Sequence, residues 1–313
     1  MANTIVNIEN LVKRYKKLIA VDNFSLQVQE GEILGLLGPN GSGKTTTISA
    51  MLALVSYDSG DIHVFGKKMS NTAYDIKRDI GVVLQNVAVF DELNVYENID
   101  YFCGLYIKDR AKRKAYVAQA IDFVQLGEHQ KMMPKKLSGG LLRRLNIACG
   151  IAHQPKLIIL DEPTVAVDPQ SREYILDGIK KLNAQGATII YTSHYMEEIE
   201  QLCDRVIIMD SGKKIAEGTK QELKRMIKTG ESIKIEVAHI ERAVLQQLQQ
   251  LPFVTSVAHD DEQLEVKCQQ GKNNLMEILN VLQQNDAPIG SILSELPTLN
   301  DVFLEMTGKA LRD

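Results

Sequence analysis

The sequence predicts an α/β protein with a mostly parallel sheet, an inserted helical subdomain and a small α+β domain at its C-terminal end. Short apolar runs alternate with helix-like segments, which is typical of a parallel sheet covered by helices on both faces. Between about Asn94 and Gln154, long segments show helical periodicity with few strand signals. We therefore expect one domain at residues 1–230, with its helical subdomain at about 90–154, and an accessory or dimerisation domain at 231–313.

The first segments predict short strands at 5–8 and 24–28, where apolar positions alternate. The apolar run Ile33–Leu37 follows a turn and ends in a glycine-rich stretch, so it predicts a buried strand that enters a loop. Beyond this loop, Lys44–Val55 contains no helix breaker and has apolar residues at helical spacing. Strand, loop and helix therefore follow one another.

The rest of the chain divides by the same signals. Helical periodicity covers Val95–Ile107 and Arg110–Leu126, and strand-like runs resume at 157–160, 187–191 and 205–209. A polar helix at about Lys220–Lys228 precedes the last domain. That domain is expected to contain a strand at 233–238, a helix at 242–250, strands at 254–259 and 263–267, a helix at 274–284 and a strand at 289–296. The order βαββαβ is that of a ferredoxin-like sandwich.

The glycine-rich loop fits the phosphate-binding pattern G-x-x-x-x-G-K-[ST]. Its glycines let backbone N–H groups turn toward an anion, and the following helix adds the positive end of its dipole. In this pattern Lys44 reaches the β- and γ-phosphates, and the Thr45 hydroxyl is a ligand for Mg²⁺. The sequence thus predicts a P-loop NTPase that uses ATP and Mg²⁺. The expected nucleotide-binding residues are Gly38, Pro39, Asn40, Gly41, Ser42, Gly43, Lys44, Thr45 and Thr46.

Two carboxylates follow the apolar run Leu157–Leu160. Such a run predicts a central strand, and its C-terminal edge is where α/β sheets bind ligands. We expect Asp161 to hold Mg²⁺ through water and Glu162 to orient and polarise the attacking water. Two acids in a surface turn would be a weak signal alone, but together with the phosphate-binding loop they predict ATP hydrolysis.

The segment Lys136-Leu137-Ser138-Gly139-Gly140-Leu141 resembles the signature of the ABC ATPases. Ser138 can cap the helix expected at about Leu141–His153, and Gly139 and Gly140 leave the first N–H groups of this helix accessible. A helix N-terminus with free amides is an anion site. In the family this helix end faces the γ-phosphate held by a second subunit, so a complete site implies a homodimer or heterodimer.

The resemblance extends to other ABC elements, which occur in the expected order. Tyr15 is similar to the aromatic residue that stacks on adenine. Gln85 resembles the glutamine that senses Mg²⁺ and water, and His194 resembles the switch histidine that contacts the γ-phosphate. Asp168 resembles the aspartate that couples the two sites of a dimer. The resemblance therefore implies that Glu162, His194 and Gln85 are catalytic and that Thr45, Gln85 and Asp161 hold the metal.

Two positions depart from the family pattern. Leu141 stands where a polar residue or methionine usually follows the signature, and Ala166 stands where related exporter ATPases often have glycine. The Leu141 side chain need not touch phosphate, so we expect activity to survive. Ala166 is expected to alter the local loop geometry slightly.

The segment from Leu296 to Gly308 resembles the tail of bacterial drug- and antibiotic-export ATPases of the daunorubicin-resistance type. This resemblance implies export of a drug, antibiotic or lipid-like compound through separate membrane-spanning permease subunits, with the chain peripheral at the cytoplasmic face of the cell membrane. An importer ATPase, a soluble ABC ATPase outside transport and a nucleotide-dependent binding module remain alternatives.

Composition is compatible with this interpretation. The net charge of -4 argues against a dedicated nucleic-acid binder, which usually has a basic excess. The cysteines at 103, 149, 203 and 268 lie far apart, so they favour free thiols over a zinc or redox motif. No apolar run approaches the roughly 20 residues of a membrane-spanning helix, and we expect no secretory signal at the N-terminus.

Overall fold

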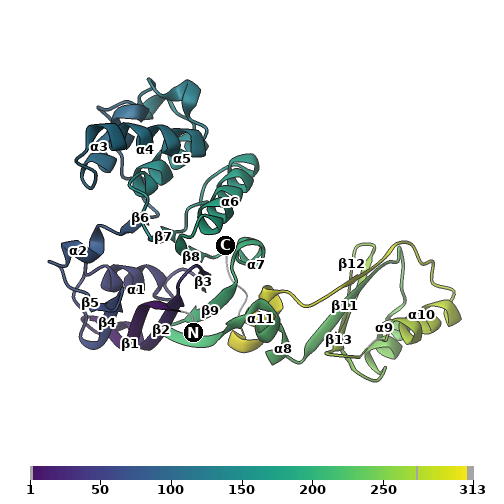
Figure 1. Cartoon of the computed structure of the whole chain (residues 1–313). Coiled ribbons are helices and arrows are strands. Elements are labelled where there is room, and N and C mark those ends of the chain that lie inside the picture. The colour runs from purple at the N-terminus through teal and green to yellow at the C-terminus, as the bar shows by residue number, and fades with distance from the viewer. Residues whose placement is uncertain (1–2, 273, 309–313) are drawn as a thin grey trace. The chain divides into compact units, whose positions relative to one another are not determined.

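The computed structural model describes residues 3–272 and 274–308, which form two compact units that divide between Glu217 and Gly218 (Figure 1). Among the described residues, no helix combines the length and the apolar content that crossing a bilayer demands. Each unit has its own buried core.

A six-stranded sheet of order β10-β9-β3-β8-β7-β6 organises the first unit. The pairs β9–β3, β3–β8, β8–β7 and β7–β6 are parallel, as predicted. Every residue of β3, β7 and β8 is buried, which explains why these strands have nearly continuous apolar sequences. The strands are β3 (Ile33–Leu37), β6 (Ile80–Val83), β7 (Leu157–Asp161), β8 (Thr188–Ser193), β9 (Arg205–Asp210) and β10 (Lys213–Thr219).

A second, antiparallel sheet of order β2-β1-β4-β5 shares a core with the parallel sheet, and the sequence did not predict it as a separate layer. Its first two strands are much longer than the expected segments at 5–8 and 24–28. Register shifts interrupt their pairing and break the period-2 alternation on which strand prediction depends. The elements of this layer are β1 (Thr4–Tyr15), β2 (Leu18–Gln29), β4 (Ser59–Val64), β5 (Lys67–Lys68) and the short helix α2 (Tyr74–Lys77).

Helices α6 (Pro169–Ala184) and α7 (Met196–Leu202) connect strands of the parallel sheet, whereas α1 (Lys44–Met51) leads from β3 to β4 of the antiparallel sheet. The helical subdomain contains α3 (Val95–Gly104), α4 (Arg110–Phe123) and α5 (Gly139–Ile151), which lie together in Figure 1. Each of these three helices begins at a polar N-cap, respectively Asn94, Asp109 and Ser138. The observed helices end two or three residues earlier than the periodicity suggested.

The second unit has the predicted βαββαβ order and forms an antiparallel sheet of order β12-β13-β11-β14. Helices α9 and α10 pack on one face, against alternate residues of β11 and β13 (Figure 1). These elements are β11 (Thr229–Glu236), α9 (Arg242–Gln249), β12 (Val254–Asp260), β13 (Gln263–Gln269), α10 (Leu275–Gln284) and β14 (Ile292–Glu295). Helix α8 (Lys220–Met226) belongs to this unit as well.

The tail segment forms helix α11 (Leu299–Thr307), which begins with a capping box between Thr298 and Asp301. The Glu305 carboxylate accepts hydrogen bonds from the backbone N–H of Lys228 at 2.7 Å and from the Thr229 hydroxyl at 2.7 Å. The polar residues of the tail therefore serve to start α11 and to fasten it to the beginning of β11.

Candidate functional site

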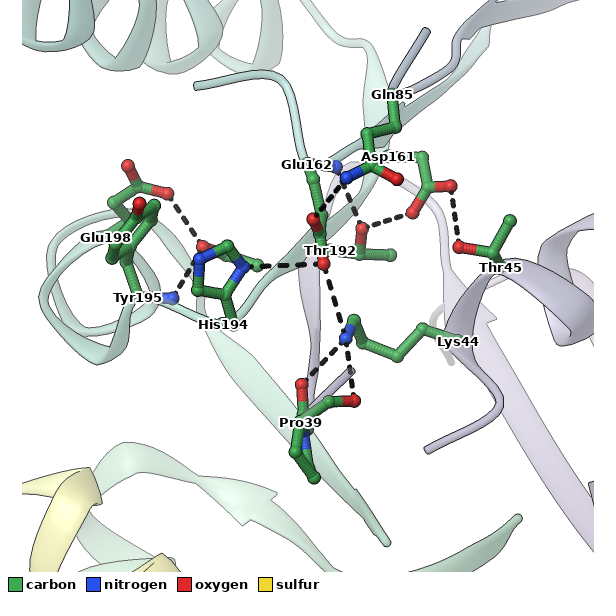
Figure 2. A network of polar contacts seen from close by, with 12 residues as sticks. Pro39, Lys44, Thr45, Gln85, Asp161, Glu162, Thr192, His194, Tyr195 and Glu198 are labelled. Atoms are coloured by element: carbon green, nitrogen blue, oxygen red, sulfur yellow. Dashed lines mark hydrogen bonds and ion pairs between the residues drawn. The ribbon is translucent and has the colours of Figure 1, made fainter. Parts of the chain in front are cut away.

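The glycine-rich loop joins β3 to α1, and the Lys44 side chain points back to Pro39 of this loop (Figure 2). Gly43 is the N-cap of α1 with φ of 105°, and a Cβ there would lie 2.5 Å from the Ala20 carbonyl oxygen. Only glycine fits this backbone path. The Lys44 ammonium donates to the carbonyl oxygens of Gly38 at 2.7 Å and Pro39 at 3.3 Å.

Lys44 is almost completely buried, and its Nζ lies 3.4 Å from Glu162 Oε1. Burial lowers the pKa of Lys44, and the neighbouring Glu162 carboxylate acts in the opposite direction. The ammonium is thus desolvated and surrounded by oxygen atoms, which makes it a strong partner for a phosphate oxygen.

Asp161 ends β7 with its carboxylate between two hydroxyl groups (Figure 2). Thr192 Oγ1 donates to Oδ1 at 2.6 Å, and Thr45 Oγ1 donates to Oδ2 at 3.0 Å. The donor set of Asp161, Thr45 and the nearby Gln85 amide consists of oxygen ligands, which suit Mg²⁺. Among the described residues, no group of three or more His, Cys, Asp or Glu side chains is placed to hold a metal.

Glu162 lies at the centre of the cluster. Its carboxylate accepts a hydrogen bond from Gln85 Nε2 at 3.1 Å and lies 3.5 Å from His194 Nδ1. Its backbone N–H bonds to both the carbonyl and the hydroxyl of Thr192, at 3.2 and 3.0 Å. Glu162 has φ of 48°, a left-handed conformation that costs about 1–3 kcal/mol for a residue other than glycine. The surrounding contacts hold this strained residue in place.

His194 follows β8 and is positioned by a buried acid on α7 (Figure 2). Glu198 accepts hydrogen bonds from the hydroxyls of Tyr191 and Ser193, both at 2.8 Å. The Ser193 hydroxyl in turn accepts the Tyr195 N–H at 2.9 Å. The backbone on both sides of His194 is therefore fixed by one carboxylate.

A cavity of about 660 Å³ opens over the glycine-rich loop and has room for a nucleotide. Tyr15 lines it and is 45% exposed, so its ring is free to stack on a base, although Lys13 Nζ lies 4.7 Å from the ring centroid. The lining brings together the following predicted residues: Tyr15, Asn40, Gly41, Gly43, Lys44, Thr45, Thr46, Gln85 and Glu162.

The signature residues and Asp168 do not line this cavity. Ser138 caps α5 by accepting the Leu141 N–H at 3.3 Å, and both Ser138 and Gly139 are exposed. Asp168 caps α6 by accepting the Ser171 N–H at 2.9 Å, which lowers the pKa of its carboxyl. Gly140 lies against this second cap, because a Cβ on it would meet Ser171 Oγ at 2.4 Å. The two helix N-termini therefore form a separate, partly exposed pair.

Sequence reasoning missed three residues of the cluster. Thr192 stands within the segment that identified His194, but only the structure shows its hydroxyl between Asp161 and Glu162. Glu198 on α7 and Arg143 on α5, whose guanidinium donates to the Glu162 carbonyl oxygen, are buried, but each stands next to an identical residue in the sequence, so no local feature marks it. Tertiary packing decides which side of a helix faces the site, and the spacing of apolar residues does not show which polar residue lies on that side.

Comparison with known proteins gives two family matches. The model described as ABC transporter matches residues 21–165, and the model described as ATP-binding protein DrrA1-3-like, C-terminal domain, matches residues 218–307. The linearmycin resistance ATP-binding protein LnrL of Bacillus subtilis (strain 168) is 39% identical over 97% of this chain and 99% of its own length. The daunorubicin resistance ATP-binding protein DrrA3 of Streptomyces coeruleorubidus is 32% identical over 98% and 97%.

Solved structures agree with the fold. A dimeric post-hydrolysis structure of an ATP-binding cassette with bound ADP and Pi is similar with a TM-score of 0.64 and 28% identity, and it covers 69% of this chain and 98% of that one. These matches confirm the predicted P-loop core and the resemblance drawn from the signature. The chain therefore belongs to the ATP-binding, ATP-hydrolysing subunits of the ABC transporter family and carries a DrrA-like C-terminal domain.

Proposed function

We propose that this chain powers export of a drug, antibiotic or lipid-like compound through separate membrane-spanning permease subunits, from the cytoplasmic face of the membrane. Similarity to linearmycin and daunorubicin resistance proteins over nearly the whole chain supports this proposal. A Nod factor export ATP-binding protein of Ralstonia nicotianae, 32% identical over 99% of this chain, supports export as the direction.

The observation that carries the chemistry is the convergence of Lys44, Gln85 and His194 on the Glu162 carboxylate. In the proposed reaction Glu162 accepts a proton from the attacking water, and Gln85 orders this water. Lys44 and His194 contact the γ-phosphate, so charge that develops on it is met by donors already in position. Mg²⁺, held by Thr45, Gln85 and Asp161, would neutralise charge on the phosphate oxygens.

We further propose that a second ATPase subunit completes each site. Ser138 caps α5 and Gly139 begins it, and both are exposed, whereas Gly140 is buried; the amides and the dipole at this helix end favour an anion. Because they do not line the cavity of their own chain, they are available to the γ-phosphate bound by a partner. ATP would then hold two subunits together, and hydrolysis would loosen them. The C-terminal unit is proposed to add dimer contacts or regulation.

The permease would dock beside the segment 85–93. A groove of about 350 Å³ opens there, lined mainly by apolar residues that include Leu52, Leu105 and Tyr106. At its side Phe90 is 42% exposed and packs edge-on against Tyr101 with centroids 4.9 Å apart. Exposed aromatic side chains next to an apolar groove are typical of a protein interface.

The test uses the purified full chain and its Glu162→Gln variant. Phosphate release should fall by at least about 100-fold in the variant, because the group that accepts the proton is lost. With ATP and Mg²⁺ the variant should run as a dimer in size-exclusion chromatography. The control is Glu197→Gln, an exposed carboxylate on α7 that should leave both readouts unchanged. Undiminished phosphate release by Glu162→Gln would refute the assignment.

A further inference from the structure

Arg143 is a buried cation on the signature helix that contacts the end of β7. Its side chain lies in α5 and is only 3% exposed. Its Nε donates to the carbonyl oxygen of Pro163 at 2.7 Å, and Nη2 donates to the carbonyl oxygen of Glu162 at 2.5 Å. The guanidinium thus binds the carbonyl oxygens of two successive residues, Glu162 and Pro163.

The same guanidinium also binds the segment that carries Gln85. Its Nη1 donates to the carbonyl oxygens of Leu84 at 3.1 Å and Gln85 at 2.7 Å. One side chain of α5 therefore joins two segments that are separated in sequence and that supply the two members of the Gln85–Glu162 hydrogen bond. The planar, fixed fork of an arginine allows these contacts to be made together, whereas a lysine offers a single point of donation.

These contacts complete the restraint on Glu162. Thr192 accepts the backbone N–H of Glu162, and Arg143 donates to its carbonyl oxygen. Both backbone polar groups of Glu162 are therefore bonded while the residue has its left-handed φ of 48°. A buried cation is costly unless hydrogen bonds satisfy it, and here they all go to backbone oxygens around the candidate base. The direction of the Glu162 carboxylate thus depends on where α5 places Arg143.

We propose that Arg143 is a positioning residue for hydrolysis, which couples the signature helix to the base of its own chain. The proposal rests on the proposed role of Glu162. The N-terminus of α5 is the end offered to the nucleotide of a second subunit, and Arg143 on the same helix holds Glu162 and Gln85 of the first. Engagement of Ser138 with one nucleotide would therefore set the alignment of the base that acts on the other.

Arg143→Lys tests this inference in the purified full chain, with Arg144→Lys as the matched control. Arg144 is the next residue of α5, but its guanidinium stacks on Tyr174 at 4.5 Å and does not reach Glu162 or Gln85. We expect Arg143→Lys to lower kcat by at least about 10-fold while KM for ATP stays within about 2-fold, since alignment and not ground-state binding is lost. Arg144→Lys should retain the kcat of the unsubstituted protein.

A double variant separates positioning from general damage. In the Glu162→Gln background, Arg143→Lys should change the residual rate by less than about 2-fold, because its effect passes through Glu162. An unchanged kcat for Arg143→Lys would overturn the proposal, as would a second, multiplicative loss in the double variant. If Arg143→Lys does not fold, Arg143→Gln, which keeps a donor for one carbonyl, undergoes the same comparison. Should Glu162→Gln alone retain turnover, the proposed catalytic role fails, whatever Arg143 does.

Discussion

The adjacent glycines of the signature are expected to respond in opposite ways to the same substitution. A Cβ on Gly139 would have its nearest neighbour, the Ala166 carbonyl oxygen, at 3.8 Å, which is an ordinary contact. A Cβ on Gly140 would meet Ser171 Oγ at 2.4 Å, Asp168 Oδ2 at 2.8 Å and Ser171 Cβ at 2.9 Å. Gly140→Ala therefore forces the N-terminus of α5 away from the N-terminus of α6.

The magnitude follows from two terms. Replacing glycine by alanine inside a helix contributes up to about 1 kcal/mol of helix propensity, and this gain applies to both positions. Overpacking against a filled neighbour costs about 1–3 kcal/mol and applies only to Gly140. The free energy of unfolding of Gly140→Ala should thus be about 1–3 kcal/mol below that of Gly139→Ala. For a domain of this size, each kcal/mol corresponds to about 2–4 °C in Tm.

Urea denaturation of the two variants, followed by circular dichroism, measures this difference. Ser171→Ala combined with Gly140→Ala should recover part of the loss, because it removes the shortest contact, and the coupling free energy should exceed about 0.5 kcal/mol. Equal stability of Gly139→Ala and Gly140→Ala would refute the reasoning, since the two sites would then have equivalent surroundings.

Three further predictions concern buried polar groups. Burial lowers the pKa of His153 to about 4, below its unfolded value of 6.5, so the folded chain should lose stability as pH falls from about 6.5 to 4. The expected loss in the free energy of unfolding is about 3 kcal/mol. Urea titrations at both ends of this pH range measure it, and the loss should be absent from His153→Phe. Thr192→Val should lower the free energy of unfolding by about 1–3 kcal/mol, because it leaves the buried Asp161 carboxylate short of a donor, and a change below about 0.5 kcal/mol would contradict the geometry. Glu198→Gln should lower kcat by about 10-fold with little change in KM for ATP, because it weakens the contacts that hold the segment around His194. Steady-state phosphate release measures both constants, and an unaltered kcat would exclude a positioning role for Glu198.

The parts of the fold that sequence alone predicted are those with strong local signals. Strand β3 was predicted with its observed bounds, because a buried five-residue apolar run ends at a glycine-rich loop. The expected helix from Lys44 to Val55 was too long: α1 ends at Met51, and Ala53 takes a left-handed φ of 52°. Nothing in the apolar spacing of this segment marks the point where the chain leaves the helix.

The candidate site was less accessible to sequence reasoning wherever a residue acts through long-range contacts. Arg143 and Arg144 are identical neighbours in the sequence, yet one is buried beneath Glu162 and the other stacks on Tyr174. As successive residues of α5, they point to different sides of the helix, and the sequence contains no local feature that distinguishes them. By contrast, the lysine and hydroxyl of the glycine-rich loop were predicted because their positions relative to the glycines are fixed by the loop itself.

The two departures from the family pattern are explained by the dependence of these elements on backbone geometry. Leu141 contributes its N–H to the Ser138 cap, so the nature of its side chain leaves the cap intact. Ala166 has φ of 59°, a conformation that glycine takes freely and that alanine takes at a cost of about 1–2 kcal/mol. Glycine at this position would avoid that cost, so we expect Ala166→Gly to raise stability, and the expected slight change in loop geometry stays a prediction. The cap at Leu141 and the left-handed conformation at Ala166 are both features of the backbone. A family motif that depends on the backbone at these positions can be identified by its spacing even where individual side chains differ.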